Sequence, residues 1–174
     1  MPDPTPIKFT IRSFQPKDAE ACARLYQEGL IGGKLAGNDT GADIDHIDSA
    51  YMRSPGSHFW VAENDKREVV GMIGVQQHLP EEGEIRRLRV RNDHLRRGIG
   101  SALLELAIQF CKEQQHIKIK LDTFTDREPA LKLFEKFGFK LSRTRDVGDK
   151  TLLYFYLDIY SGERPAAKRI KDKA

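Results

Sequence analysis

The sequence predicts an α+β fold, in which a largely antiparallel sheet carries helices on its faces. Strand-like alternation and helix-like spacing of apolar residues follow one another along the 174 residues in the order β, α, α, β, β, β, α, β, α, β, β. The length suits one domain, and 39% hydrophobic with 32% charged residues is typical of a globular protein. No run of about 18 apolar residues is present, so we expect no membrane-spanning helix.

The first predicted strand is Ile7–Phe14, where Ile7, Phe9 and Ile11 share one face. Pro16 follows at a position that the first turn of a helix tolerates, and the helix is expected to continue to Leu30. The other elements expected in this half are a glycine-rich loop over 31–41, a helix at Ala42–Tyr51, and strands at His58–Ala62 and Val69–Gln76.

The next strand, Glu84–Arg91, has an irregular pattern. Leu88 and Val90 share one face, whereas regular alternation places Ile85 on the other face. A slip of one residue is what a β-bulge produces. The alternative is a chance slip in a regular strand.

The second half is expected to contain two helices and three strands. The first helix, Gly98–Glu113, has a buried stripe that includes Leu103, Leu104 and Ala107. A strand is expected at Ile117–Leu121. The next helix is expected to start at a capping box of Thr125 and Glu128 and to end at Gly138. The last two strands, Phe139–Asp146 and Leu152–Ile159, are joined by a hairpin at Gly148-Asp149.

Charge is unevenly distributed along the chain. The net charge is +3, and residues 161–174 contribute five basic and two acidic residues to it, so residues 1–160 are neutral overall. This balance predicts no general affinity for nucleic acid. The two cysteines, Cys22 and Cys111, fall in helical apolar patterns without a metal-binding spacing, and we interpret them as buried free thiols in a reducing, cytoplasmic location.

The segment from Leu88 to Ser101 carries the chemistry that the sequence reveals. A strand leads into an arginine-rich loop and then into Gly98-Ile99-Gly100-Ser101 at the start of a helix. Free N–H groups at a helix start bind phosphate, glycines allow close approach, and Arg96 and Arg97 add positive charge. Walker and dinucleotide motifs are absent. The alternative is a glycine-started helix beside solvated arginines.

This region resembles the GNAT superfamily of N-acetyltransferases. The resemblance rests on the strand Glu84 to Val90, the loop and helix from Arg96 to Leu104, and the later helix Ala130-Leu131-Lys132-Leu133-Phe134-Glu135-Lys136-Phe137-Gly138-Phe139. Two motifs in register are more specific than either alone, and the likeness covers about 150 residues. It implies a sheet of six to seven strands with a splayed, bulged strand and about four flanking helices.

The resemblance also implies roles for the matching residues. The loop and helix start, Arg96, Arg97, Gly98, Ile99, Gly100 and Ser101, would hold the pyrophosphate of acetyl-CoA. The edge of Leu88, Arg89 and Val90 would pair with the pantetheine arm, and the phase slip at Arg86-Arg87 would open the sheet for the thioester. Phe134, which stands where the family often has an acidic tyrosine, would pack against the thioester region. Leu95 and Arg127 also depart from the family pattern.

Proton transfer requires further groups. The resemblance implies Glu84, at the start of the bulged strand, as the general base, with Glu81 and Glu82 as competitors and a solvated acidic turn as the alternative. Tyr154 or Tyr156 is a possible proton donor, with ordinary sheet packing as the alternative. The Asp43, Asp45, His46 and Asp48 cluster supplies no set of metal ligands, and we interpret it as a solvated helix without a metal.

The resemblance therefore implies an acetyl-CoA-dependent N-acetyltransferase in which a primary amine attacks directly in a ternary complex. We expect one domain over 1–160, a basic tail over 161–174, and a monomer or homodimer that acts on a small-molecule or protein amine, without nucleic acid or membrane. A catalytically silent acyl-CoA-binding sensor and a protein-binding adaptor that keeps only the fold are the alternatives.

Overall fold

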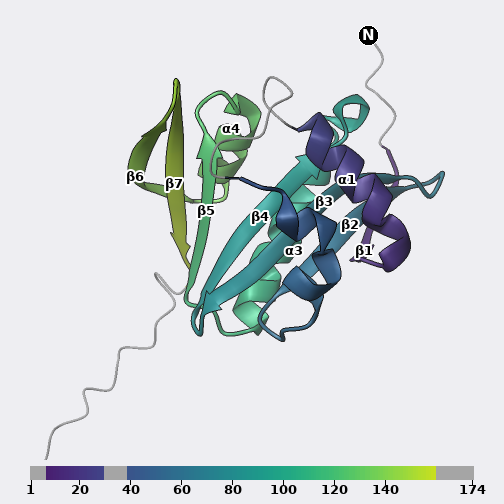
Figure 1. Ribbon diagram of the computed structural model, residues 1–174, viewed down its shortest axis with the longest axis horizontal. Coiled ribbons are helices and arrows are strands. Elements are labelled where there is room, and N and C mark those ends of the chain that lie inside the picture. Colours follow the sequence, from purple (N-terminus) through teal and green to yellow (C-terminus); the bar gives the residue numbers. More distant parts are fainter. Residues whose placement is uncertain (1–6, 30–38, 160–174) are drawn as a thin grey trace, which may run out of the picture.

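The computed structural model describes residues 7–29 and 39–159 (Figure 1). Seven strands form one mixed sheet in the order β1-β2-β3-β4-β5-β7-β6. The strands are β1 (Phe9–Ser13), β2 (His58–Asn64), β3 (Val69–Leu79), β4 (Glu82–Val90), β5 (Lys118–Phe124), β6 (Lys140–Val147) and β7 (Lys150–Asp158). The helices are α1 (Ala19–Glu28), α2 (Ala42–Asp45), α3 (Ile99–Glu113) and α4 (Glu128–Lys136), with short turns η1 (Pro16–Asp18), η3 (Asp48–Met52) and η4 (Asn92–His94). The predicted fold class and element order are confirmed.

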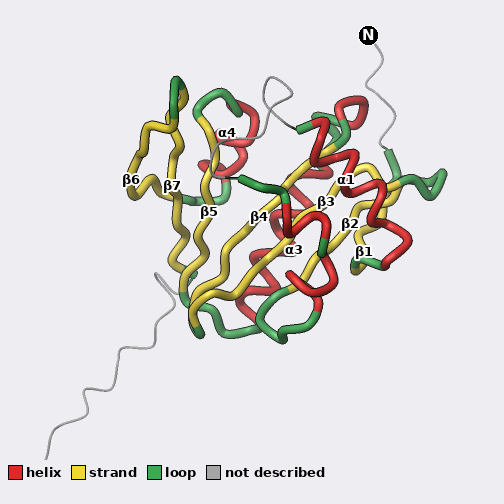
Figure 2. Tube along the Cα trace, viewed as in Figure 1, coloured by secondary structure: helices red, strands yellow, loops and turns green. Residues whose placement is uncertain are grey.

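Two hydrophobic cores lie on opposite faces of the sheet. In Figure 2 the yellow strands of this sheet have red helices on both faces. One core joins α3 and α4 to the sheet through residues such as Ile73, Leu104 and Phe134. The other joins α1 and η3 to β2 and β3 through residues such as Tyr51 and Phe59. We call the sheet face beneath α1 and α2 the α1 face, because the candidate catalytic side chains lie there.

β4 contains the predicted bulge. Met72 pairs with Arg89 and Gly74 pairs with Arg86, so Arg87 and Leu88 together oppose the single residue Ile73. Arg87 has a φ of 61°, a left-handed conformation that is uncommon for a residue with a side chain. The extra residue changes the alternation, so that Ile85, Leu88 and Val90 all pack on the α3 core.

β4 and β5 are parallel and pair only from Glu82 to Glu84 with Lys118 to Lys120. Beyond this pairing β4 runs on to Val90 and β5 runs on to Phe124, and the two strands diverge (Figure 1). We call this divergence the splay. It leaves the β5-facing edge of β4 from Ile85 to Val90 without a strand partner among the described residues.

Three local expectations need correction or fall outside the structure. The helix expected at Ala42–Tyr51 divides into α2 and the π-helical turn η3. The capping box is wrong: Arg127, and not Thr125, occupies the N-cap of α4, and no side chain caps this helix end. Most of the glycine-rich loop and the 161–174 tail lie outside the described residues.

Candidate active site

The start of α3 provides unpaired backbone donors. Gly98, at the N-cap, has a φ of 82°, and no side chain caps the helix. Arg96 also has a positive φ, 61°, and left-handed residues in such a loop turn successive N–H groups toward one side to form an anion-binding concavity. The helix dipole adds partial positive charge at the same place. The backbone geometry therefore suits a phosphate group.

The glycines of this loop differ in what surrounds them. A Cβ at Gly98 would meet no atom within 4 Å, so the space beside the helix start is open. A Cβ at Gly100 would contact Leu133 and Val90 at ordinary distances of 3.5 and 3.7 Å. The protein itself therefore has room for a Cβ at Gly100, and we expect a requirement for glycine there to come from a ligand.

The six arginines between residues 86 and 97 divide into separate groups. Arg86 contacts Gln76 and Glu84, Arg87 binds Asp39 and Asp43, and Arg91 binds Glu68 and Asp93. Arg96 and Arg97 are exposed, and neither has an ion pair within the described part of the chain. The local excess of positive charge thus lies beside the uncapped start of α3.

The expected cofactor-binding residues of β4 lie along the splay, with different side-chain positions. Leu88 and Val90 point into the α3 core, so only their backbone groups face the diverging strand. The side chain of Arg89 lies on the α1 face and packs against Gly29, at the end of α1. Because Ile99 is 1% exposed, it also presents only its backbone at the helix start, whereas Ser101 is partly buried in the first turn of α3.

Phe134 is part of the hydrophobic core. Its side chain is 4% exposed, and its ring packs on Phe139 and Phe155 at centroid distances of 5.8 and 6.2 Å. The ring therefore supports the sheet beneath the splay. Arg127, seven residues earlier, donates a hydrogen bond to the carbonyl oxygen of Gly29 and so connects the residue before α4 to the end of α1.

The structure brings Glu84 and Tyr154 to the same face of the sheet. Glu84 is opposite Lys120 on β5, and Tyr154 on β7 is opposite Asp122 on β5. Side chains at paired positions and two residues apart share a face, so all four lie on the α1 face. Glu84 contacts His78 at 2.7 Å, and the Arg143 guanidinium lies 3.8 Å from the centre of the Tyr154 ring.

Asp122 is a candidate that the sequence analysis missed. It lies on β5 within the splay, next to Tyr154 across the strand pair. Desolvation by the surrounding protein, together with the negative charge of Glu84, raises the pKa of Asp122. A carboxyl group with a raised pKa beside a second carboxylate is a frequent feature of catalytic sites. The sequence gives no signal for it, because Asp122 becomes a neighbour of Glu84 only when β4 and β5 pair.

An ion-pair cluster fixes the bulge to the α1 face. Arg87 donates hydrogen bonds to Asp39 and Asp43, with nitrogen–oxygen distances of 2.5–2.9 Å, and Tyr51 donates its hydroxyl to Asp43. Hydrogen bonds from Arg87 lower the pKa of Asp39 to about 2. Burial opposes ionisation of Asp43, but the hydrogen bonds from Arg87 and Tyr51 outweigh it and lower the pKa of Asp43. The interpretation of this acidic segment as a solvated helix is wrong for Asp43.

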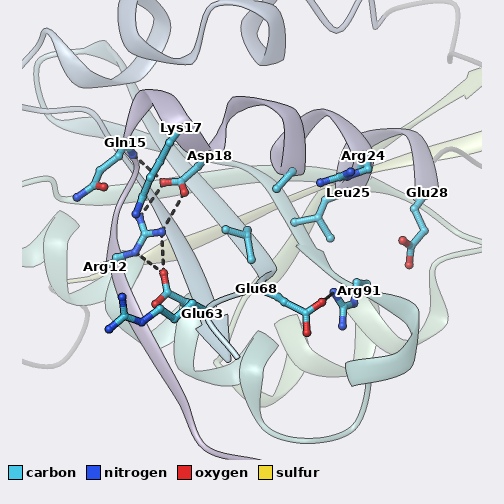
Figure 3. Close-up of a pocket in the computed structure, with 13 residues that line it drawn as sticks. Arg12, Gln15, Lys17, Asp18, Arg24, Leu25, Glu28, Glu63, Glu68 and Arg91 are labelled. Carbon is cyan, nitrogen blue, oxygen red and sulfur yellow. Dashed lines mark hydrogen bonds and ion pairs between the residues drawn. The ribbon is translucent and has the colours of Figure 1, made fainter. Parts of the chain in front are cut away.

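A cavity of about 690 Å³ lies beside α1 (Figure 3), and residues of η1, α1 and the turn between β2 and β3 form most of its lining. Several of its charged groups pair with one another: Arg12 binds Asp18 and Glu63, and Arg91 binds Glu68. None of the candidate catalytic residues lines this cavity. We therefore place the active site at the splay and not in this cavity.

The described residues contain neither a cluster of metal ligands nor a helix able to span a membrane. Across residues 7–29 and 39–159, no three His, Cys, Asp or Glu residues come together as a metal site. None of the helices in that part of the chain is long and apolar enough to cross a bilayer.

The bulged β4, the splay and the uncapped start of α3 are the features that the resemblance to the GNAT superfamily implied. The model of the Acetyltransferase (GNAT) family matches residues 21–139, and the chain belongs to this family. Human N-acetyltransferase 8 is 36% identical over 106 residues, which cover 56% of this chain and 45% of the human protein. The N-acetylaspartate synthetase of Xenopus tropicalis is 33% identical over 99 residues, covering 56% of this chain and 36% of that protein. The chain thus spans about half the length, or less, of these curated relatives.

Solved structures show the same fold over nearly their whole length. Ard1 from Thermoplasma volcanium aligns with a TM-score of 0.73 and 26% identity, covering 86% of this chain and 97% of that one. A GNAT-family acetyltransferase from Staphylococcus aureus Mu50 aligns with a TM-score of 0.76 and 21% identity, covering 87% and 99%. YncA from Salmonella typhimurium, solved with its cofactor acetyl-CoA, aligns with a TM-score of 0.71 and 17% identity, covering 91% and 98%.

Proposed function

We propose that this protein is an acetyl-CoA-dependent N-acetyltransferase, in which a primary amine attacks the thioester directly in a ternary complex. One observation carries the proposal: the edge of β4, which no described strand pairs beyond Glu84, leads to an uncapped helix start beside Arg96 and Arg97, which have no ion pair among the described residues. This arrangement suits a long ligand with an amide-containing arm and a phosphate group. Family membership, curated relatives named N-acetyltransferase and a neighbouring structure with acetyl-CoA support the same conclusion.

The residues at the splay supply the binding contacts. The backbone of Leu88, Arg89 and Val90 would pair with the pantetheine arm as an added strand, because amide groups there satisfy the open edge of the sheet. The N–H groups from Gly98 to Ser101, with Arg96 and Arg97, would bind the pyrophosphate. A free N–H near the bulge would stabilise the oxyanion, since a fixed backbone dipole needs no reorganisation.

Proton transfer is assigned to the α1 face. An amine such as that of lysine, with a reference pKa of about 10.4, must lose a proton before it attacks. We propose Glu84 as the general base, either directly or through water, with Asp122 as a neighbouring carboxyl group. Tyr154 is the proposed donor to the departing thiolate.

A turnover screen tests the activity. Purified protein is incubated with acetyl-CoA and a mixed panel of small-molecule and peptide amines, thiol release is followed, and products are identified by mass spectrometry. Glu84→Gln is expected to lower kcat/KM by at least about 10²-fold, the usual contribution of a positioned base. Acetyl-CoA binding without turnover of any amine would instead support the silent sensor. Absence of binding would point to the adaptor.

We also propose a cellular location and an oligomeric state for the protein. Burial raises the pKa of both thiols, Cys22 and Cys111, to about 12, so they are unreactive and fit a reducing cytoplasm. We propose a monomer or homodimer.

A further inference from the structure

Two arginines converge on Gly29, the residue that follows α1. Arg127, which follows β5, donates a hydrogen bond to the Gly29 carbonyl oxygen. Arg89, on β4, packs so closely that a Cβ at Gly29 would lie 2.2 Å from its Nε. One side chain comes from β4 and the other from the turn between β5 and α4, so the two meet at the α1 side of the splay.

Arg89 lacks a carboxylate partner among the described residues, unlike Arg86, Arg87 and Arg91. Its Nη1 donates to the neighbouring Leu88 carbonyl oxygen at 2.9 Å. Its Nε is buried and has no hydrogen-bond partner among the described residues. Burial, with the positive charges of Arg127 and Arg87, lowers the pKa of Arg89 to about 9. A buried donor without a partner destabilises a fold, more so when it is charged.

Nearby described groups do not supply a carboxylate to this guanidinium. The carboxylates of Asp39 and Asp43 are already bound by Arg87. The negative end of the α1 dipole attracts cations, which explains the bond from Arg127 to Gly29. No described carbonyl of α1 accepts a hydrogen bond from Arg89. The side chain also remains partly accessible, so a ligand can reach it.

We propose that Arg89, assisted by Arg127, binds a carboxylate of the acceptor, so that the acceptor belongs to the amino acid class. This inference rests on the proposed acetyltransferase function and narrows its substrate. Arg89 lies on the β4 edge that is proposed to hold the pantetheine arm, and its side chain lies on the same face of the sheet as Glu84. A guanidinium binds carboxylate through two parallel hydrogen bonds. An amino acid carries both an amine for the proposed base Glu84 and a carboxylate for this cation.

The test compares two acceptor sets. One is an equimolar mixture of the common amino acids, and the other is the mixture of the corresponding amino acid amides. The amides carry the less basic amine, so intrinsic reactivity favours them. We expect at least tenfold faster thiol release with the acids. The best single acid is then used to measure KM.

Variants of Arg89 separate substrate recognition from structure. Arg89→Gln should raise the KM for the acid at least tenfold, abolish the preference over its amide and leave acetyl-CoA affinity unchanged. Arg89→Lys should restore part of the preference. Removing an unpartnered buried charge should also raise the unfolding temperature, whereas loss of a purely structural arginine lowers it. Arg24→Gln, at an exposed position on α1, is the matched control and should change none of these values.

Opposite results overturn the inference. Equal turnover of acids and amides, or turnover only of amines without a carboxylate, removes it and leaves the acetyltransferase proposal intact. An Arg89→Gln defect confined to acetyl-CoA binding assigns the arginine to the cosubstrate. Failure of every amine removes both proposals. If Arg89→Gln does not fold, the preference of the wild-type protein for amino acids over their amides still tests the inference.

Discussion

Arg87 in the bulge of β4 forms a two-pronged hydrogen bond with Asp43 of α2, through Nε–Oδ2 at 2.9 Å and Nη2–Oδ1 at 2.5 Å. The Arg87 side chain is 6% exposed and that of Asp43 is 10% exposed. This pair attaches a helix of the α1 face to the irregular point of the strand that borders the splay.

Asp43→Asn should destabilise the protein, because it leaves a buried guanidinium less well compensated. We expect the free energy of unfolding to fall by about 2–3 kcal/mol. This loss is smaller than for a buried arginine that loses its only carboxylate partner, because Asp39 still binds Arg87. Asp45→Asn, at an exposed position in the same helix, should change it by less than about 0.5 kcal/mol. Urea unfolding of both variants measures the difference; equal values would show that the pair contributes little.

Asp122→Asn should stabilise the protein by a small, pH-dependent amount, because solvent screens this exposed carboxylate. The folded pKa of Asp122 is raised above its usual value of 3.8, so the folded state binds the proton more tightly than the unfolded state does. Ionisation of Asp122 therefore costs stability as the pH rises from the unfolded pKa through the folded pKa. The variant should melt at a higher temperature than the wild type at pH 7, and the gain should disappear below about pH 3.9. A gain that is constant with pH would contradict the assignment.

Gly100→Val should weaken acetyl-CoA binding more than tenfold without unfolding the protein. The Cβ meets only ordinary contacts within the protein, so the added side chain acts against the ligand. Isothermal titration calorimetry gives the affinity. Gln109→Val places the same β-branched residue at an exposed site of α3 and controls for its cost to the helix. Unchanged affinity in Gly100→Val would remove the pyrophosphate assignment.

Arg96→Ala/Arg97→Ala should reduce the salt dependence of CoA binding. Both side chains are exposed, and their attraction to phosphate is screened over a Debye length of about 8 Å near physiological ionic strength. Affinity measured from 50 to 500 mM salt should fall steeply for the wild type and less steeply for the double variant. Parallel slopes would mean that the two arginines face solvent without contacting the cosubstrate.

Phe134→Tyr should raise turnover by less than tenfold and lower the melting temperature. The Phe134 ring is enclosed by Phe139 and Phe155, so the new hydroxyl is buried among apolar groups at a cost of about 1–3 kcal/mol. Steady-state kinetics and thermal melts check both parts. A rise of tenfold or more with unchanged acetyl-CoA affinity would show that a missing acid limits this enzyme.

Local patterns in the sequence were sufficient to predict the strands and every helix except the one expected at Ala42–Tyr51, and they indicated the bulge without excluding a chance slip. The slip between Ile85 and Leu88 is visible in sequence because the bulge returns both residues to the same core. Side-chain partners across the sheet were not predictable. The pairing of Arg87 with Asp39 and Asp43 joins residues more than 40 positions apart, and Asp122 meets Glu84 only through the β4–β5 register. The capping box failed because Thr125 and Glu128 match a local motif that the N-cap at Arg127 does not use.

The narrow β4–β5 pairing has a consequence for the cohesion of the molecule. Three residues on each strand join a four-stranded half of the sheet to a three-stranded half. A cosubstrate that pairs with the free edge of β4 completes the missing part of this seam, so its binding energy also holds the two halves together. Hydrogen exchange at the seam should therefore slow when acetyl-CoA binds, and substitutions that loosen the seam should weaken cosubstrate affinity and global stability in parallel.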